Sequence, residues 1–506
     1  MLRTFLLLVF AFTACAETPY FTIKVVDAQT GRGVPLVELE TVSHVRFVTD
    51  NAGLVAFNEP SLMDRAVFLH VRSHGYEFPK DGFGFAGTAL TPRAGSRAEL
   101  KITRRNIAER LYRITGEGLY RDTILAGEKP PLREPLLNAQ VVGQDSTQAA
   151  VYRGKIFWLW GDTSRASYPL GNFATSGATS ELPAHGGLPA ATGIDLRYFA
   201  DEHGFARAMW PRPEHGVVWT DGLLVVKDRA GEERLVAHYE HREGLAKLLD
   251  HGLGAFDEAA GVFKKIAALP AIDAWHSPRG HPTRVSESDG EFFYSGTRDT
   301  MFPCVRVKAA FEDVQNPAAY EAWTCLSDGA HFDGKKTRLE RDASGHALYA
   351  WKRNADPLTA AQERELIDAA VLREDEARYQ PRDIEAGKTV RFHAGSVRWN
   401  DFRKKWIAIA GEHGGTSLLG EVWFSEADSP LGPWRRARKI VTHDRYSFYN
   451  VVQHDFLDEE GGRFIYFEGT YTHDFSGNPD ATPRYEYNQI MYRLDLADER
   501  LRLDKP

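Results

Sequence analysis

Five stretches of the sequence share one arrangement of polar and apolar residues. Each opens on a polar residue, continues through an apolar run, a polar turn and a second apolar run, and closes on another polar residue. If the two runs form a hairpin, the opening and closing residues return to the same edge. The five pairs are Asp145 with Asp162, Asp221 with Glu240, His281 with Arg298, His393 with Glu412, and Asn450 with Glu468.

Carboxylates and imidazoles gathered at one edge suit acid and base chemistry. Burial and like-charge proximity separate the pKa values of neighbouring carboxyl groups, so one can donate a proton while another accepts one. Cleavage of a glycosidic bond needs such a pair. Aromatic rings that could stack on sugar faces lie on or near the same stretches, although those inside a strand are better explained as core residues. They are Trp158, Trp160, Trp219, Trp275, Tyr449 and Tyr471.

The turns and the repeat predict the fold. Turn-forming residues separate the two runs of every unit, at Arg153-Gly154, Ala230-Gly231, Asp289-Gly290, Asn400-Asp401 and Gly461-Gly462. Five such units predict an all-β fold, a five-bladed β-propeller over residues 138–506, with a two-sheet sandwich as the alternative. Between the third and fourth units, Thr359 and Gln362 form a capping-box pattern, which predicts a helical insertion.

The region before the repeat divides into three parts. Residues 1–16 have a basic residue, a short apolar run and small residues near their end, which predicts a secretory signal peptide. The alternative is a lipoprotein site with a lipid anchor on Cys15. Residues 17–104 contain alternating strands and Gly-containing turns and predict a small β-sandwich, whereas residues 105–137 predict a linker with a short helix. We therefore expect an exported protein, periplasmic or extracellular, without an integral membrane span.

Composition argues against a nucleic-acid partner and leaves two alternatives for the state of the cysteines. The net charge of -8 is spread along the 506 residues without a basic patch, which argues against nucleic-acid binding. Beyond Cys15 the chain has Cys304 and Cys325, which in an exported protein predict a disulfide, with two buried free thiols as the alternative. Neither has a CxxC partner, which argues against a cysteine zinc site.

Other chemistries use the same residues. A set of histidines could hold a structural metal ion in the channel, although imidazoles spread over separate units have no local ligand spacing. A lyase acting on acidic polysaccharides would use His and Tyr as base and acid, with Arg279 and Arg298 neutralising a uronate. No G-x-S-x-G elbow supports a serine hydrolase. The histidines are His215, His281, His393, His413 and His454.

Two regions carry family resemblances. "VVDAQTGRGVPLVEL" and "TDNAGLVAF" resemble the carboxypeptidase regulatory-like, transthyretin-like sandwich, which implies a support or binding module. "GQDSTQAAVYRGKIFWLWGDTS", "SVRWNDFRKKWIAIAG", "VWFSEADSPLGPW" and "YFEGTYTHDFSG" resemble the five-bladed propeller glycosidases, including glycoside hydrolase family 43 and a related arabinan-cleaving propeller family.

The second resemblance implies roles for individual residues. Asp145 matches the family's general base and Asp221 the aspartate that tunes the acid. The third unit offers His281 and Arg298 where the family has its acid, so Glu412 is the substitute, with Glu468 behind it. Gln144, Asp162, His281, Arg298, His393, Asn450 and Glu468 are the candidates for binding sugar.

These observations predict an exported glycoside hydrolase with a carbohydrate substrate and no cofactor. The competing prediction from a different class is a non-catalytic propeller that only binds glycans.

Overall fold

The computed structural model describes residues 19–167, 175–211, 215–244, 246–269, 275–482 and 486–504. The predicted signal peptide and Cys15 lie outside these residues. Strands greatly outnumber helices in the described chain, which confirms the mostly β composition expected from the sequence. No helix within the same residues combines the length and the apolar character needed to cross a membrane.

Two four-stranded sheets form the N-terminal region. They enclose a common core that includes Ile23, Val25, Leu39, Leu69 and Ile102. In the first sheet, β1 pairs with β8 in parallel and with β4 antiparallel. The first sheet has the strand order β4-β1-β8-β6, with β4 (Leu54–Phe57), β1 (Phe21–Asp27), β8 (Arg97–Arg104) and β6 (Tyr76–Glu77). The second has the order β3-β2-β5-β7, with β3 (Arg46–Val48), β2 (Glu38–Thr41), β5 (Val67–Arg72) and β7 (Gly87–Leu90).

Five further sheets, here called sheets I to V, account for most of the remaining described chain. Sheet I has β11 (Gln148–Tyr152), β12 (Lys155–Trp160), β14 (Ser176–Glu181) and β15 (Arg197–Tyr198); sheet II has β16 (Val217–Lys227), β17 (Glu233–Glu243), β18 (Lys247–Asp257) and β19 (Val262–Ala268). Sheet III has β20 (Thr283–Glu287), β21 (Gly290–Thr297), β22 (Thr300–Lys308), β23 (Glu321–Thr324) and β24 (Ala350–Lys352).

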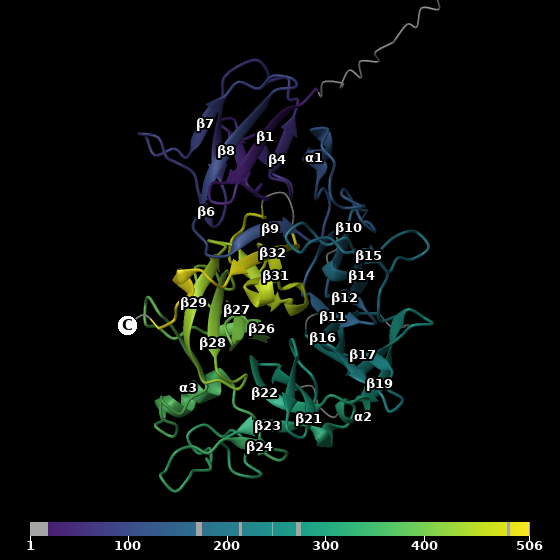
Figure 1. The fold of residues 1–506 in the computed structure, drawn as a ribbon, viewed down its shortest axis with the longest axis vertical. Coiled ribbons are helices and arrows are strands. Elements are labelled where there is room, and N and C mark those ends of the chain that lie inside the picture. Colours follow the sequence, from purple (N-terminus) through teal and green to yellow (C-terminus); the bar gives the residue numbers. More distant parts are fainter. Residues whose placement is uncertain are drawn as a thin grey trace, which may run out of the picture.

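Sheets IV and V complete this set. Sheet IV has β25 (Tyr379–Asp383), β26 (Phe392–Asn400), β27 (Lys405–Glu412), β28 (Glu421–Ala427) and β29 (Trp434–Thr442). Sheet V has β30 (Ser447–Gln453), β31 (Phe464–Thr472), β32 (Asn488–Asp495) and β9 (Glu109–Arg113). A short ribbon pairs β10 (Val141–Gln144) with β13 (Thr163–Arg165) beside sheet I. In Figure 1 the purple N-terminal sheets lie above β9 and β32, and sheets I to V follow one another around the rest of the molecule.

The five predicted hairpins are confirmed. Each of sheets I to V contains an antiparallel pair made by the two predicted runs. In the first hairpin Arg153 and Gly154 have φ values of 49° and 77°. Two successive left-handed residues make the tight turn whose twist matches that of the strands.

Sheet V joins a strand that precedes sheet I in the chain with the last three strands. β9 lies inside the segment predicted as a linker, and it pairs antiparallel with β32 through Ile490 and Arg113. All five residues of β9 are buried. The strand therefore shows no alternation of apolar and polar residues, which is the signal that identified the other strands.

Helices are short. α1 (Arg121–Leu125) follows β9, and α2 (Phe311–Val314) follows β22. α3 (Ala360–Asp368) is the predicted insertion helix, and its capping box is confirmed because Thr359 and Gln362 bond each other's backbone N–H. Single 3-10 turns are η1 (Pro183–His185), η2 (Pro317–Ala319), η3 (Asp455–Leu457), η4 (Glu460–Gly462) and η5 (Glu499–Leu501).

The predicted disulfide between Cys304 and Cys325 is wrong, because both are buried free thiols. Cys304 packs in the core between sheets II, III and IV, whereas Cys325 packs with Leu358 and Leu366 of the insertion. Burial raises the pKa of both thiols, that of Cys325 to about 11, so both stay protonated.

Candidate active site

Residues from all five sheets line one cavity of about 1120 Å³. The cavity receives the first strands of sheets II, IV and V and the ends of the hairpins in sheets I and III. Seven of the ten predicted site residues line it: Asp145, Asp162, Asp221, His281, Arg298, His393 and Asn450. Glu240, Arg279, His413, Trp219, Tyr449 and Tyr487 line it as well.

β-Bulges shape three of the hairpins at the cavity. The register shifts after Asp221 in β16, after Phe392 in β26 and after Tyr449 in β30. In each case two residues of the first strand oppose one residue of the second. Bulges redirect side chains and are frequent beside active sites. Here they lie at the points where Asp221, His393 and Asn450 reach the cavity.

Hydrogen bonds to the backbone join Asp145 to the Gly161-Asp162 segment. The Asp162 backbone N–H donates to Asp145 Oδ1 at 2.7 Å, and the Gly161 N–H donates to the Asp145 carbonyl at 2.8 Å. A Cβ on residue 161 would lie 2.6 Å from Asp145 Oδ1, so glycine is required there. The Tyr449 hydroxyl donates to Asp145 Oδ2 at 2.7 Å, and Trp219 Nε1 donates to Asp162 Oδ1 at 2.8 Å.

The two carboxyl groups have different environments. Burial raises the pKa of Asp145, but the Tyr449 hydroxyl and the Asp162 N–H stabilise its ionised form. Burial raises the pKa of Asp162 to about 7, with the Asp145 charge as the second cause and only the Trp219 donor opposing. Asp145 is therefore the more readily ionised of the two groups, and Asp162 retains a proton near neutral pH. This division is what an acid and base pair requires.

Asp221 is held as an anion by backbone and by arginine. Its Oδ1 accepts from Gly280 N at 2.8 Å and from Gly222 N at 2.9 Å, and Arg279 lies 3.7 Å from Oδ2. Burial still raises its pKa, against these three stabilising contacts. Gly222 has φ 60°, and a Cβ there would meet the Pro278 carbonyl at 2.4 Å. The backbone of this bulge thus fixes the carboxylate.

Glu240 stays ionised through arginine contacts. Arg279 donates to Glu240 Oε1 at 3.2 Å and to His238 Nδ1 at 3.0 Å, and Arg242 donates to Glu240 Oε2 at 2.7 Å. Although burial acts in the opposite direction, Arg242 and Arg279 hold the pKa of Glu240 below its usual value. A carboxylate held in this way can accept hydrogen bonds from a ligand, but it is a poor proton donor.

Two of the cavity histidines, His281 and His393, are neutral. Burial lowers the pKa of His281 to about 3, with Arg398 and His454 adding repulsion. Burial also lowers the pKa of His393, and His413 contributes. Neutral imidazoles donate and accept hydrogen bonds with hydroxyl groups. In the part of the chain that the structure describes, no three His, Cys, Asp or Glu side chains are grouped so as to hold a metal ion.

Three predicted site residues lie outside the cavity lining. Glu412 accepts from Trp423 Nε1 at 2.8 Å, whereas its neighbour His413 lines the cavity. Glu412 stays a predicted catalytic residue that this cavity lining does not include. Glu468 is fully buried and bonds His454 Nε2 at 2.6 Å.

Register and alternation explain the other two discrepancies. Glu468 is opposite Val452, not Asn450, because the bulge in β30 displaces the pairing. Gln144 is buried beside Asp145; it donates to Ser176 Oγ and accepts from the Tyr198 hydroxyl, both at 2.6 Å. These hydrogen bonds are internal to the protein, and the predicted sugar-binding role of Gln144 stays a prediction.

Aromatic residues divide as their positions suggest. Trp158 and Trp160 are buried in the core of sheet I, as expected for rings inside a strand. Trp219 and Tyr449 line the cavity, but their polar atoms hold the two aspartates. Tyr487 is a cavity residue that the sequence did not single out, because it follows the last turn without any local pattern.

No protein-family model and no curated protein sequence matches the chain. Solved structures similar to it include a thermostable family-43 glycoside hydrolase, at 12% identity and TM-score 0.32, covering 73% of this chain and 95% of that one. Another is an endo-1,5-α-L-arabinanase from Thermotoga petrophila RKU-1, at 10% identity and TM-score 0.32, covering 72% and 71%. A third is an N-acetylgalactosamine deacetylase from F. plautii in complex with blood group B trisaccharide, at 10% and 0.33, covering 70% and 91%.

Proposed function

We propose that the chain is a glycoside hydrolase in which sheets I to V are the five blades of a propeller around the catalytic cavity. The observation that carries the proposal is the joined pair of Asp145 and Asp162 in a cavity lined by all five sheets. Burial and the nearby Asp145 charge raise the pKa of Asp162, which favours one protonated and one ionised carboxyl group. Hydrolysis of a glycosidic bond needs one group of each kind.

In this mechanism Asp162 is the general acid. Its proton passes to the glycosidic oxygen as the bond between that oxygen and the anomeric carbon breaks. Trp219 Nε1 holds Asp162 Oδ1 at 2.8 Å and leaves the other oxygen to carry the proton. Asp162 replaces Glu412 in this role, because Glu412 does not line the cavity.

Asp145 is the base or the nucleophile. As a base it takes a proton from water, and the hydroxide adds to the anomeric carbon; as a nucleophile it forms a glycosyl ester that water then cleaves. Tyr449 and the Asp162 N–H fix both of its oxygens. The configuration of the product distinguishes the two routes.

Other cavity residues bind and orient the sugar. The Asp221 carboxylate, with Arg279 behind it, lies across the cavity and accepts hydroxyl groups. His281, His393, Arg298 and Asn450 supply further hydrogen bonds. No part of this proposal requires a cofactor.

The test is a polysaccharide panel digested with wild-type protein, Asp145→Asn and Asp162→Asn, followed by chromatography of the products. We expect reducing sugars from the wild type and a loss of at least ~100-fold in each variant. Asp401→Asn, in the exposed turn between β26 and β27, is the matched control and keeps full activity. Unsaturated products would assign a lyase instead, and binding without products would assign a glycan-binding protein.

A further inference from the structure

A second cavity, of about 1100 Å³, lies between the N-terminal sheets and sheets IV and V. Its N-terminal side comes from β2, β3, β5, β6 and β8, and its other side from the loop before β30, from β31 and from the loop that follows β31. None of its lining residues lines the candidate active site. Ligand pockets usually measure roughly 300–1,000 Å³, so this space suits an organic ligand better than a single inorganic ion.

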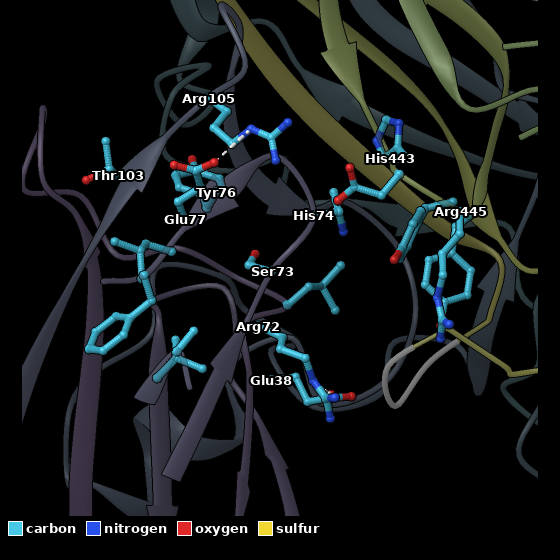
Figure 2. A pocket seen from close by; sticks show the side chains of 18 of the residues that line it. Glu38, Arg72, Ser73, His74, Tyr76, Glu77, Thr103, Arg105, His443 and Arg445 are labelled. Carbon is cyan, nitrogen blue, oxygen red and sulfur yellow. Dashed lines mark hydrogen bonds and ion pairs between the residues drawn. The ribbon is translucent and has the colours of Figure 1, made fainter. Parts of the chain in front are cut away.

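Exposed ion pairs line this cavity. Arg72 pairs with Glu38 at 2.9 Å and Arg105 with Glu77 at 3.4 Å, as Figure 2 shows for the second pair. On the other side Arg445 pairs with Asp480 at 3.1 Å. The arginines keep further N–H donors and the carboxylates further acceptor positions. A ligand with many hydroxyl groups can use both.

Aromatic rings form the buried part of the cavity lining. The His74 ring lies 4.6 Å from Tyr471 and 4.9 Å from His443, and Tyr446 lies 5.4 Å from Tyr471. These four rings come from both sides of the interface and are at least nine-tenths buried. Flat apolar surfaces of this kind complement the face of a sugar ring.

A buried guanidinium lies behind His74. Arg110 is 1% exposed, donates to His74 Nε2 and Ser73 Oγ, and lies against the Tyr76 ring. Within the described chain it forms no ion pair with a carboxylate. Burial of a guanidinium without a carboxylate at ion-pair distance is costly, and the Arg110 field extends into the cavity, where it opposes the rise that burial causes in the pKa of Asp444.

His74 connects this charge to the cavity. Because Nε2 accepts from Arg110, Nδ1 carries the ring proton, and no described residue accepts that proton. A hydrogen bond from a cation strengthens the donor at the opposite end of the ring. His443 offers no such donor, since its Nδ1 donates to the Gly420 carbonyl at 2.8 Å and its Nε2 accepts from Tyr492.

We propose that this second cavity binds an acidic saccharide, a chain of hexuronate units, with one carboxylate received by His74 in the field of Arg110. Of the four rings, His74 and Tyr446 keep exposed surface for a sugar face, and the ion pairs bind the hydroxyl groups. The lining has a small excess of positive charge, with five basic side chains, Arg46, Arg72, Lys80, Arg105 and Arg445, against four carboxylates, Glu38, Glu77, Asp444 and Asp480. The proposal does not depend on hydrolysis at the first cavity, because it concerns residues that the first cavity does not share.

The test is calorimetric titration of the full chain carrying Asp145→Asn, so that no ligand is consumed. The ligands are the trimers of galacturonate and of mannuronate, with galactotriose as the neutral counterpart. We expect at least one acidic trimer to bind, and galactotriose to bind about tenfold more weakly, because it lacks a charge-assisted hydrogen bond.

Variants in the same background locate the site. Arg445→Gln and Arg105→Gln, both exposed positions that need not disturb folding, should each weaken the acidic trimer about tenfold. Arg229→Gln, an exposed arginine at sheet II paired with Glu312, is the matched control and should change nothing. Arg298→Gln, in the first cavity, should also leave this binding unchanged.

Three results would overturn the proposal: no binding of either acidic trimer, equal binding of galactotriose, or binding that Arg298→Gln removes and Arg445→Gln does not. The last would assign the ligand to the first cavity. Failure of the proposed hydrolase is seen separately, as absence of products from the wild-type protein.

Discussion

The pKa of Asp162 makes stability depend on pH in a way that a single substitution should remove. Its ordinary value of 3.8 rises to about 7 in the folded protein. Between these two values the folded state keeps a proton that the unfolded state has lost. Stability contributed by this proton is therefore complete below about pH 4 and is lost as pH rises through about 7.

The magnitude follows from the difference between the two pKa values. At ~1.4 kcal/mol per pKa unit, ionising Asp162 in the folded protein costs at most about 4 kcal/mol. Asp162→Asn keeps an oxygen acceptor for Trp219 and never ionises. Relative to the wild type, the variant should therefore gain between ~1 and ~3 kcal/mol when pH is raised from 4.5 to 8.

Urea unfolding followed by tryptophan fluorescence measures this gain. All 11 tryptophans lie at or after Trp158, so their fluorescence reports sheets I to V and not the N-terminal sheets. Asp401→Asn is the control, since Asp401 is exposed and its pKa is lowered by Trp399 and Lys404. The reasoning is refuted if the stability difference between wild type and Asp162→Asn is the same at both pH values.

Three more predictions concern the site and the cysteines. Tyr449→Phe removes a hydrogen-bond donor to Asp145, so the pKa of Asp145 rises and the acidic limb of the profile of kcat/KM against pH moves to higher pH. Tyr152→Phe is the control: it loses only a hydrogen bond to Glu258 and leaves this profile unchanged. Gly161→Ala displaces the Asp145 carboxylate and lowers kcat at least ~100-fold, while the circular dichroism spectrum shows that the fold is retained. Gly82→Ala, whose Cβ would meet open space, is the control and does not change kcat. Without reductant, iodoacetamide should label Cys304 and Cys325 in urea but not in buffer, as measured by peptide mass spectrometry. If both cysteines stayed unlabelled in urea, the predicted disulfide would be supported instead.

The hairpins could be predicted because their turns and strand patterns are local. Arg153-Gly154 and the alternation around it depend on neighbouring residues alone. The capping box at Thr359 and Gln362 is local in the same way, and the structure contains it. By contrast β9 has no alternation, since both of its faces are buried in sheet V.

The predicted site residues and the cavity lining differ where one residue of register decides which side chain reaches the cavity. Glu412 and His413 are neighbours, and only His413 lines the cavity. The bulges in β16, β26 and β30 shift the pairing by one residue at the cavity, and nothing in the local sequence announces them apart from Gly222. Charge type could be predicted from the sequence, but the partner that tunes each charge could not. Asp162 acquires its raised pKa from burial and from Asp145, which only the folded hairpin brings together.

The candidate base depends on contacts between the first and last sheets. Tyr449 reaches Asp145 from β30, and the Ser146 N–H donates to Thr470 Oγ1 of β31 at 3.1 Å. Asn450, with φ 51° in the bulge, donates to Ser146 Oγ. Sheet V itself is completed by β9, which precedes sheet I in the chain. The geometry at Asp145 therefore forms only when sheets I and V meet, so loss of β9 should impair the site although β9 contributes no residue to the cavity.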